Sequence, residues 1–125
     1  MNFYDSDKHL IPVMMWMIGE SFGRKTYDFG MARQCSEHAV YMASIGQCFH
    51  ADSMLLGSAT AENVAHEHVR NGNFIGAIER IVLNILHSPG HRQNLTNYPV
   101  IGAGTAVRFE HGREPVLYVA QRFRH

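Results

Sequence analysis

The stretch that decides the fold is IGAGTAVRFEHGREPVLYVAQRF, residues 101–123. Bulky and smaller side chains alternate on both sides of residues 110–113, which contain a glycine and are typical of a turn. An alternation with a period of two predicts strands, so the sequence predicts a C-terminal β-hairpin. Gly102 and Gly104 share the face opposite the bulky side chains, and we expect another element to approach closely there.

Two helices are predicted upstream of the hairpin. Apolar residues recur at spacings of three and four over about 29–45, where Gly46 ends the pattern, and over about 73–87. Ser88-Pro89-Gly90 must end the second helix, because proline lacks an amide donor and Gly90 permits a left-handed turn. The small polar residues at 51–61 indicate a loop. Helices followed by an antiparallel hairpin predict the α+β class, with helices packed on a small antiparallel sheet.

The longest apolar run covers residues 10–18 and contains Pro12. It has about half the length that a bilayer crossing needs, so no transmembrane segment is predicted. Asp5 and Asp7 precede the run and Glu20 follows it, which differs from a signal peptide, and no signal peptide is visible. We interpret the run as a first helix that is buried or faces a partner, with Pro12 in its first turn.

The composition excludes several classes of protein. The 125 residues correspond to one domain, and 46% hydrophobic residues argue against disorder. Eleven basic and eleven acidic side chains give a net charge of zero, which argues against nucleic-acid binding. Cys35 and Cys48 are predicted to lie about 20 Å apart along one helix, so no disulfide is expected between them.

The nine histidines are the unusual feature of the composition. His66 and His68 flank a glutamate, as in half of the metalloprotease motif H-E-x-x-H, but position 70 is an arginine. We therefore interpret this pair as part of an exposed polar segment. His87 ends the second helix, where the helix dipole favours a cation. His38 is interpreted as a surface or boundary residue, which leaves His50 and His91 as the candidates for chemistry.

Four motifs in sequence order resemble the bacterial, SCP-like branch of the CAP superfamily of cysteine-rich secretory, antigen 5 and pathogenesis-related 1 proteins. The motifs are HAVYMASIGQCFH at 38–50, AENVA at 61–65, SPGHRQNL at 88–95, and the strands IGAG and YVAQRF at 101–104 and 118–123. The resemblance covers residues 29–123. It implies a single-domain α-β-α sandwich over residues 1–125, in which residues 1–28 form a divergent first helix.

The resemblance also implies a cavity that holds a divalent ion, usually zinc, on two histidines. Carried over by position, His50 and His91 are the metal ligands, and Glu62 acts on a metal-bound water. These three residues are therefore the candidate catalytic set. Two neutral imidazoles and water can hold Zn²⁺, or another divalent ion, with open coordination positions. The family's second acid is replaced by Ser88, so the sequence leaves open whether the domain is a hydrolase or any enzyme.

Two further functions are implied by the resemblance. Some CAP domains bind sterols, fatty acids or phospholipids. Met54, Leu55 and Leu56 either pack into the core or line a groove for a lipid, small-molecule or peptide ligand. Alternatively, the domain is a scaffold in an envelope or particle, with a homo-oligomer formed through the apolar face of residues 13–18. The family resemblance implies a secreted or envelope-associated protein.

Overall fold

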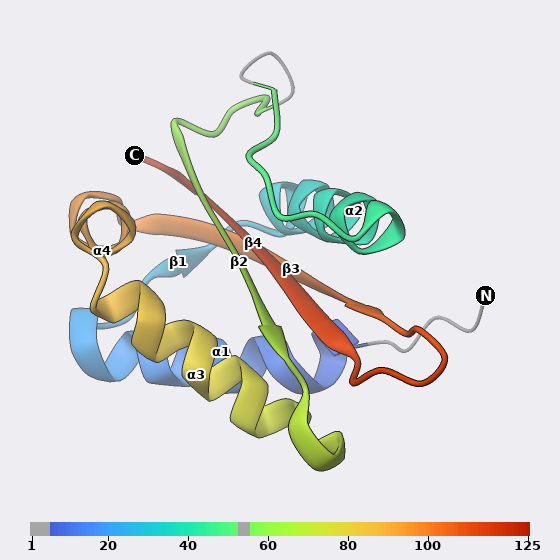
Figure 1. Ribbon diagram of the computed structural model, residues 1–125. Helices are drawn as coiled ribbons and strands as arrows, with labels where there is room; N and C mark the ends of the chain where they lie inside the picture. Colours follow the sequence, from blue (N-terminus) through green and yellow to red (C-terminus); the bar gives the residue numbers. More distant parts are fainter. Residues whose placement is uncertain (1–5, 53–55) are drawn as a thin grey trace.

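The predicted hairpin forms the centre of a four-stranded sheet in the computed structural model (Figure 1). The structure describes residues 6–52 and 56–125. Asp5, which precedes the apolar run, and Met54 and Leu55, which belong to the candidate lipid groove, lie outside the described residues. Leu56, the remaining residue of that candidate groove, is half-buried.

The strand order of the sheet is β1-β3-β4-β2. The central strands β3 (Val100–Arg108) and β4 (Val116–Arg124) are antiparallel, which confirms the predicted hairpin. At one edge β2 (Ala61–His68) pairs antiparallel with β4, and at the other β1 (Thr26–Tyr27) pairs parallel with β3, so the sheet is mixed. The sequence of β2 is polar and shows no clear alternation of apolar and polar residues. Within the described residues, β2 is an edge strand that pairs on one side only.

One hydrophobic core lies between the sheet and the two helices α1 (Ser6–Phe22) and α3 (Phe74–Leu86). Helix α1 contributes Leu10, Met14 and Ile18, which are spaced four apart and are at most 1% exposed. The run predicted as a first helix is therefore part of the core, and its helix begins four residues earlier than the apolar pattern, at Ser6. Pro12 consequently lies inside the helix, one turn beyond the predicted position.

Helix α2 (Phe29–Ile45) covers β3 and β4 on the opposite face of the sheet (Figure 1). The expected close approach at the two glycines is confirmed. A Cβ atom at Gly102 would lie 2.5 Å from the backbone nitrogen of Ala32, and one at Gly104 would overlap the backbone of Ser36. Gly46 ends α2 in the left-handed conformation, with φ of 71°.

The predicted end of α3 is confirmed. The prediction that Gly90 forms a left-handed turn after this helix is wrong. Ser88 precedes a further helix, α4 (Pro89–Asn97), which begins with the proline. Proline suits the first position of a helix, because its fixed φ is helical and the amide it lacks has no partner there. Gly90 is consequently helical, and the short 3₁₀ turn η2 (Arg70–Gly72) lies between β2 and α3.

Both cysteines are free thiols. Cys35 is buried on α2, whereas Cys48 lies beyond the end of that helix and is half-buried, so the two do not share one helix as predicted. No helix among the described residues is long and apolar enough to cross a membrane. The architecture is an α+β domain, with α2 on one face of the sheet and α1 and α3 on the other.

Candidate functional site

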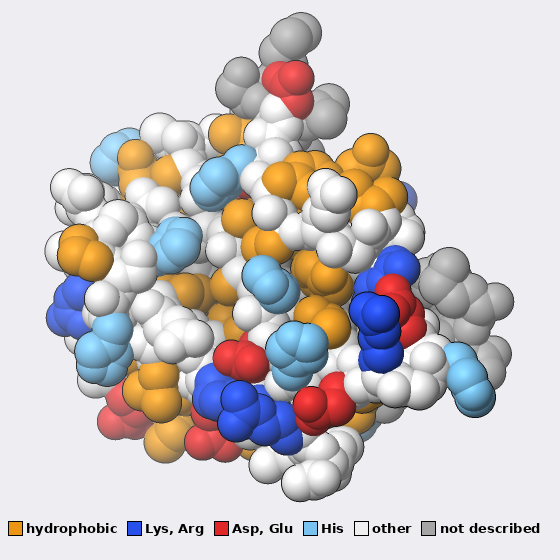
Figure 2. Space-filling model, in the orientation of Figure 1, with side chains coloured by type: hydrophobic (Ala, Val, Ile, Leu, Met, Phe, Trp, Pro, Cys, Tyr) orange, Lys and Arg blue, Asp and Glu red, His pale blue; other side chains and the backbone are white. Residues whose placement is uncertain are grey.

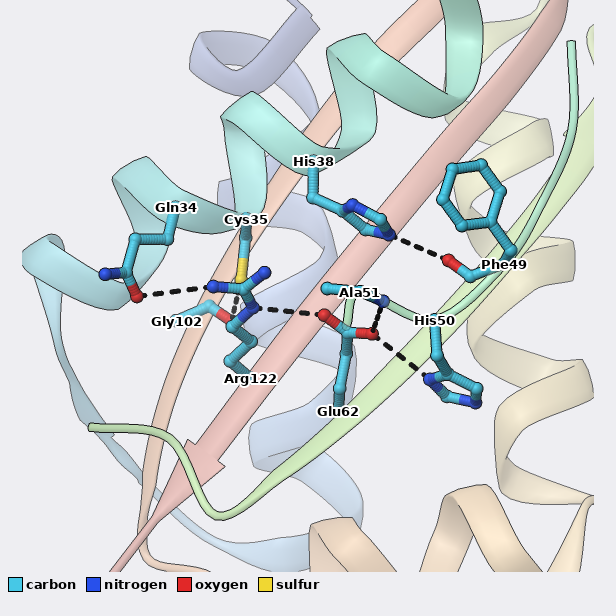
Figure 3. Close-up of polar contacts among 9 residues, drawn as sticks. All are labelled: Gln34, Cys35, His38, Phe49, His50, Ala51, Glu62, Gly102 and Arg122. Atoms are coloured by element: carbon cyan, nitrogen blue, oxygen red, sulfur yellow. Dashed lines mark hydrogen bonds and ion pairs between the residues drawn. The ribbon is translucent and has the colours of Figure 1, made fainter. Parts of the chain in front are cut away.

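Glu62 is the centre of a polar cluster where β2 begins (Figure 3). Its Oε1 atom is 3.1 Å from Nδ1 of His50 and accepts a hydrogen bond of 2.8 Å from the backbone N–H of Ala51. The Glu62 side chain is 3% exposed and that of His50 is 61% exposed. A proton on Nδ1 that is donated to the carboxylate leaves the lone pair of the neutral imidazole on Nε2. The cluster therefore presents His50 as an accessible nitrogen ligand.

Arg122 holds the other carboxylate oxygen of Glu62. Its Nε atom donates to Oε2 at 3.0 Å, and its Nη1 atom donates to Oε1 of Gln34 on α2 at 3.3 Å. The two charged residues are direct partners in the register of β2 and β4, and each side chain is 3% exposed. The result is a buried ion pair that fixes the carboxylate from the sheet side (Figure 3).

Arg122 is the functional residue that sequence reasoning missed, although a signal for it was present. It is a charged residue in a strand that is otherwise mainly apolar between Val116 and Phe123, apart from Gln121. Glu62 is an acid at the start of a partly buried strand. Buried charges are almost always paired. The pairing of these two residues depends on the register of β2 against β4, which places them opposite each other.

The nearby thiol of Cys35 is not a nucleophile. Burial raises the pKa of Cys35 to about 12, even though the positive charge of Arg122 acts in the opposite direction. Its Sγ atom donates to the carbonyl oxygen of Gly102 at 3.4 Å. At neutral pH the thiol is therefore protonated, and it is packed between α2 and β3.

His91 lies in the first turn of α4, and a buried amide network fixes its backbone. Nδ2 of Asn63 donates to the carbonyl oxygen of His91 at 3.0 Å and lies 3.2 Å from Oε1 of Gln121. Oδ1 of Asn63 accepts from Nδ2 of Asn94 at 2.8 Å. Asn63 and Gln121 are fully buried, so α4 is attached to the sheet through buried, hydrogen-bonded polar side chains.

The imidazoles of His91 and His50 interact electrostatically. Burial lowers the pKa of His91, and the charge that His50 carries when protonated lowers this pKa further. Glu62 contacts His50, and the two predicted ligands, His50 and His91, are linked by this electrostatic interaction. A lowered pKa keeps the imidazole of His91 neutral near pH 7, which is the form that binds a metal.

The lowered pKa of His91 predicts that the stability of the domain depends on pH. Because the pKa in the folded state lies below the ordinary value of 6.5, the folded state binds the proton more weakly than the unfolded state. The contribution of this difference to stability is fully present above pH 6.5. It is lost as the pH falls from there through the lower pKa of the folded state. In urea unfolding of metal-free protein, we expect His91→Gln to lose less stability than the wild type between about pH 7.5 and about pH 5. Equal losses of stability in the wild type and in His91→Gln would contradict a lowered pKa for His91.

The other histidines have structural partners or lie elsewhere. Nε2 of His38 is 2.7 Å from the carbonyl oxygen of Phe49, so this buried boundary residue holds the segment that leads to His50. Nδ1 of His87 is 2.8 Å from the carbonyl oxygen of Leu83 at the end of α3. His66 and His68 are exposed on β2, as the sequence indicated. Across residues 6–52 and 56–125, no group of three or more His, Cys, Asp or Glu side chains is arranged to hold a metal ion.

No protein-family model and no curated protein matches this sequence. Solved structures with a similar fold include two bacterial proteins. An outer surface protein from Borrelia burgdorferi matches with a TM-score of 0.69 and 14% identity, over 99% of this chain and 98% of that one. An extracellular protein containing an SCP domain, from Bacillus anthracis, matches with a TM-score of 0.56 and 17% identity. This second match covers 90% of this chain and 40% of that one. The chain therefore has an SCP/CAP-like fold.

Proposed function

We propose that this CAP-like domain binds a divalent metal ion, Zn²⁺ or a similar ion, through His50 and His91. The observation that carries the proposal is the contact between Nδ1 of His50 and the buried carboxylate of Glu62. In metal sites the ligating imidazole usually donates its other ring N–H to such an acceptor, which fixes its tautomer and orientation. The same contact leaves Nε2 of His50 exposed as a ligand.

His91 supports the proposal in two ways. Its lowered pKa favours the neutral, ligating form, and part of this shift comes from the charge of protonated His50. Its backbone is held by Asn63, so α4 presents the ring from a fixed position. Two imidazoles leave coordination positions for water or a ligand, which is typical of an open rather than a closed metal site.

Glu62 has a positioning role in this proposal. A bound ion would polarise a water or a carbonyl oxygen that coordinates it. Both oxygens of Glu62 are already occupied, one by His50 and Ala51 and the other by Arg122. A carboxylate with this set of donors orients its neighbours and has little capacity left to take a proton from water. The proposed function is therefore metal binding, and no hydrolytic step is assigned to Glu62.

Calorimetry on metal-stripped protein tests the proposal. We expect the wild type to bind zinc with an affinity that His50→Ala and His91→Ala each reduce by about tenfold or more. His87→Ala, which changes a histidine at the end of a different helix, is the matched control and should leave the affinity unchanged. Zinc affinity should also fall below about pH 6.5, because both ligands must be neutral. Equal zinc affinity in the wild type and both ligand variants would exclude the site.

A second candidate is an interaction protein at the cell surface. Trp16 on the outer face of α1 is 67% exposed, and large exposed aromatic residues are frequent anchors of interfaces. The two similar structures carry the names of an outer surface protein and an extracellular protein. These names support an envelope-associated or secreted location for this chain, with a partner or a second copy bound along α1. A lipid- or peptide-binding module is a further alternative from the family resemblance.

A further inference from the structure

A second pair of histidines lies on the edge strand, away from the cluster around Glu62. His66 and His68 are two residues apart on β2, so their side chains leave the same face of the strand. Both are exposed, and they stand opposite Tyr118 and Val116 in the register with β4. Figure 2 shows histidine side chains gathered on the face of the molecule that carries β2.

The ring nitrogens of this pair are available. Unlike His38, His50 and His87, neither His66 nor His68 has a side-chain hydrogen bond among the described residues. The ring of His66 stacks on that of Tyr118, with centroids 5.7 Å apart and planes inclined by 19°. This contact uses the face of the imidazole and leaves its nitrogen-bearing edge open.

The spacing suits a chelate. Residues two apart on a strand are separated by about 6.8 Å along the chain, and imidazoles on the same face can lean toward one shared ion at about 2 Å from each nitrogen. His66 is held by its stack, and His68 borders an open hollow of about 460 Å³, which leaves its ring room to turn.

The charges around the hollow do not oppose a cation. Its lining includes two arginines, Arg108 and Arg113, and two glutamates, Glu110 and Glu114. Arg108 and Arg113 both pair with Glu110. Glu114 lines the same hollow as His68, so the lining carries two acidic and two basic side chains. Arg80, which donates to the carbonyl oxygen of His68, is 3.8 Å from Glu67.

We propose that His66 and His68 form a second, two-histidine metal site that prefers Cu²⁺. Copper(II) binds nitrogen ligands more tightly than the other common divalent ions, and its tetragonal geometry accepts two imidazoles with water in the remaining positions. The site is separate from the pair formed by His50 and His91, so it does not depend on the function proposed above.

The test uses the His50→Ala/His91→Ala variant, in which the first site is removed. Copper is added in substoichiometric steps while amide signals are followed by NMR. We expect paramagnetic broadening first at residues 65–69 and at their partners 115–119. Electron spin-echo spectroscopy of the same sample should show coupling to two imidazole nitrogens.

The decisive comparison is with variants of the pair. His66→Gln and His68→Gln should each weaken copper binding by about 100-fold, the usual gain from linking two weak ligands. His111→Gln, which removes an exposed histidine in the hairpin turn, is the matched control and should leave the binding unchanged. The proposal is overturned if broadening centres elsewhere, or if the single variants bind copper as tightly as their parent.

Discussion

Replacing Gly104 with alanine should destabilise the domain by about 3 kcal/mol. The added methyl group would overlap the backbone of Ser36, and a helix backbone cannot turn aside as a flexible side chain can. Helix α2 would have to lift from β3, which would loosen the core that Cys35 and Met42 form against the sheet. Urea unfolding at neutral pH measures the loss as a lower midpoint with an unchanged slope.

Gly19→Ala is the matched control for this prediction. Gly19 lies in α1, and a Cβ atom there would meet nothing within 4 Å. Alanine is favoured over glycine inside helices, so the control should gain about 0.5–1 kcal/mol. If Gly104→Ala were as stable as the wild type, α2 and β3 could not be as close as the structure shows.

Replacing Arg122 with methionine should cost about 3–5 kcal/mol of folding free energy, because it leaves the carboxylate of Glu62 buried without its partner. The double variant Glu62→Gln/Arg122→Met removes both charges and should recover part of this loss. The single variant should also weaken zinc binding, since the carboxylate that orients His50 loses the Nε donor that fixes it. Urea unfolding and zinc calorimetry of the same samples measure the two effects.

Arg113→Met is the control for that change. Arg113 is 79% exposed and its nitrogen lies 3.6 Å from Glu110, so this ion pair contributes little to stability. We expect a change within about 0.5 kcal/mol. An Arg122 variant that behaved like the Arg113 variant would show that the ion pair with Glu62 is hydrated rather than buried.

The parts of the fold that the sequence predicts are those with a strong period or a clear terminator. The hairpin alternates over two long runs, and two glycines on one face of a strand, at 102 and 104, are typical of close approach by another element. Strand β2 was missed because it is an edge strand with polar residues on both faces. Helix α4 was missed because proline and glycine together indicate a stop, whereas here proline is the first residue of a new helix.

The sequence identifies the candidate residues of the site, but it does not predict the contacts between them. His50, Glu62 and His91 are identified by motifs, but they lie on a loop, a strand and a helix whose relative placement depends on tertiary packing. The partners that hold them, Arg122 and Asn63, are single polar residues in strands. Their roles follow from the register of β2 against β4, which a sequence pattern alone does not specify.

The order of the strands along the chain has a consequence for synthesis on the ribosome. The two central strands of the sheet, β3 and β4, are also the last two, and every helix precedes them in the sequence. A growing chain that has not reached residue 100 lacks the two strands on which α2 packs, and these strands also complete the core that α1 and α3 form. Such a nascent chain leaves part of these faces prone to aggregation until β3 and β4 have been made. The domain is thus expected to complete its sheet only after β4 has been synthesised, rather than segment by segment.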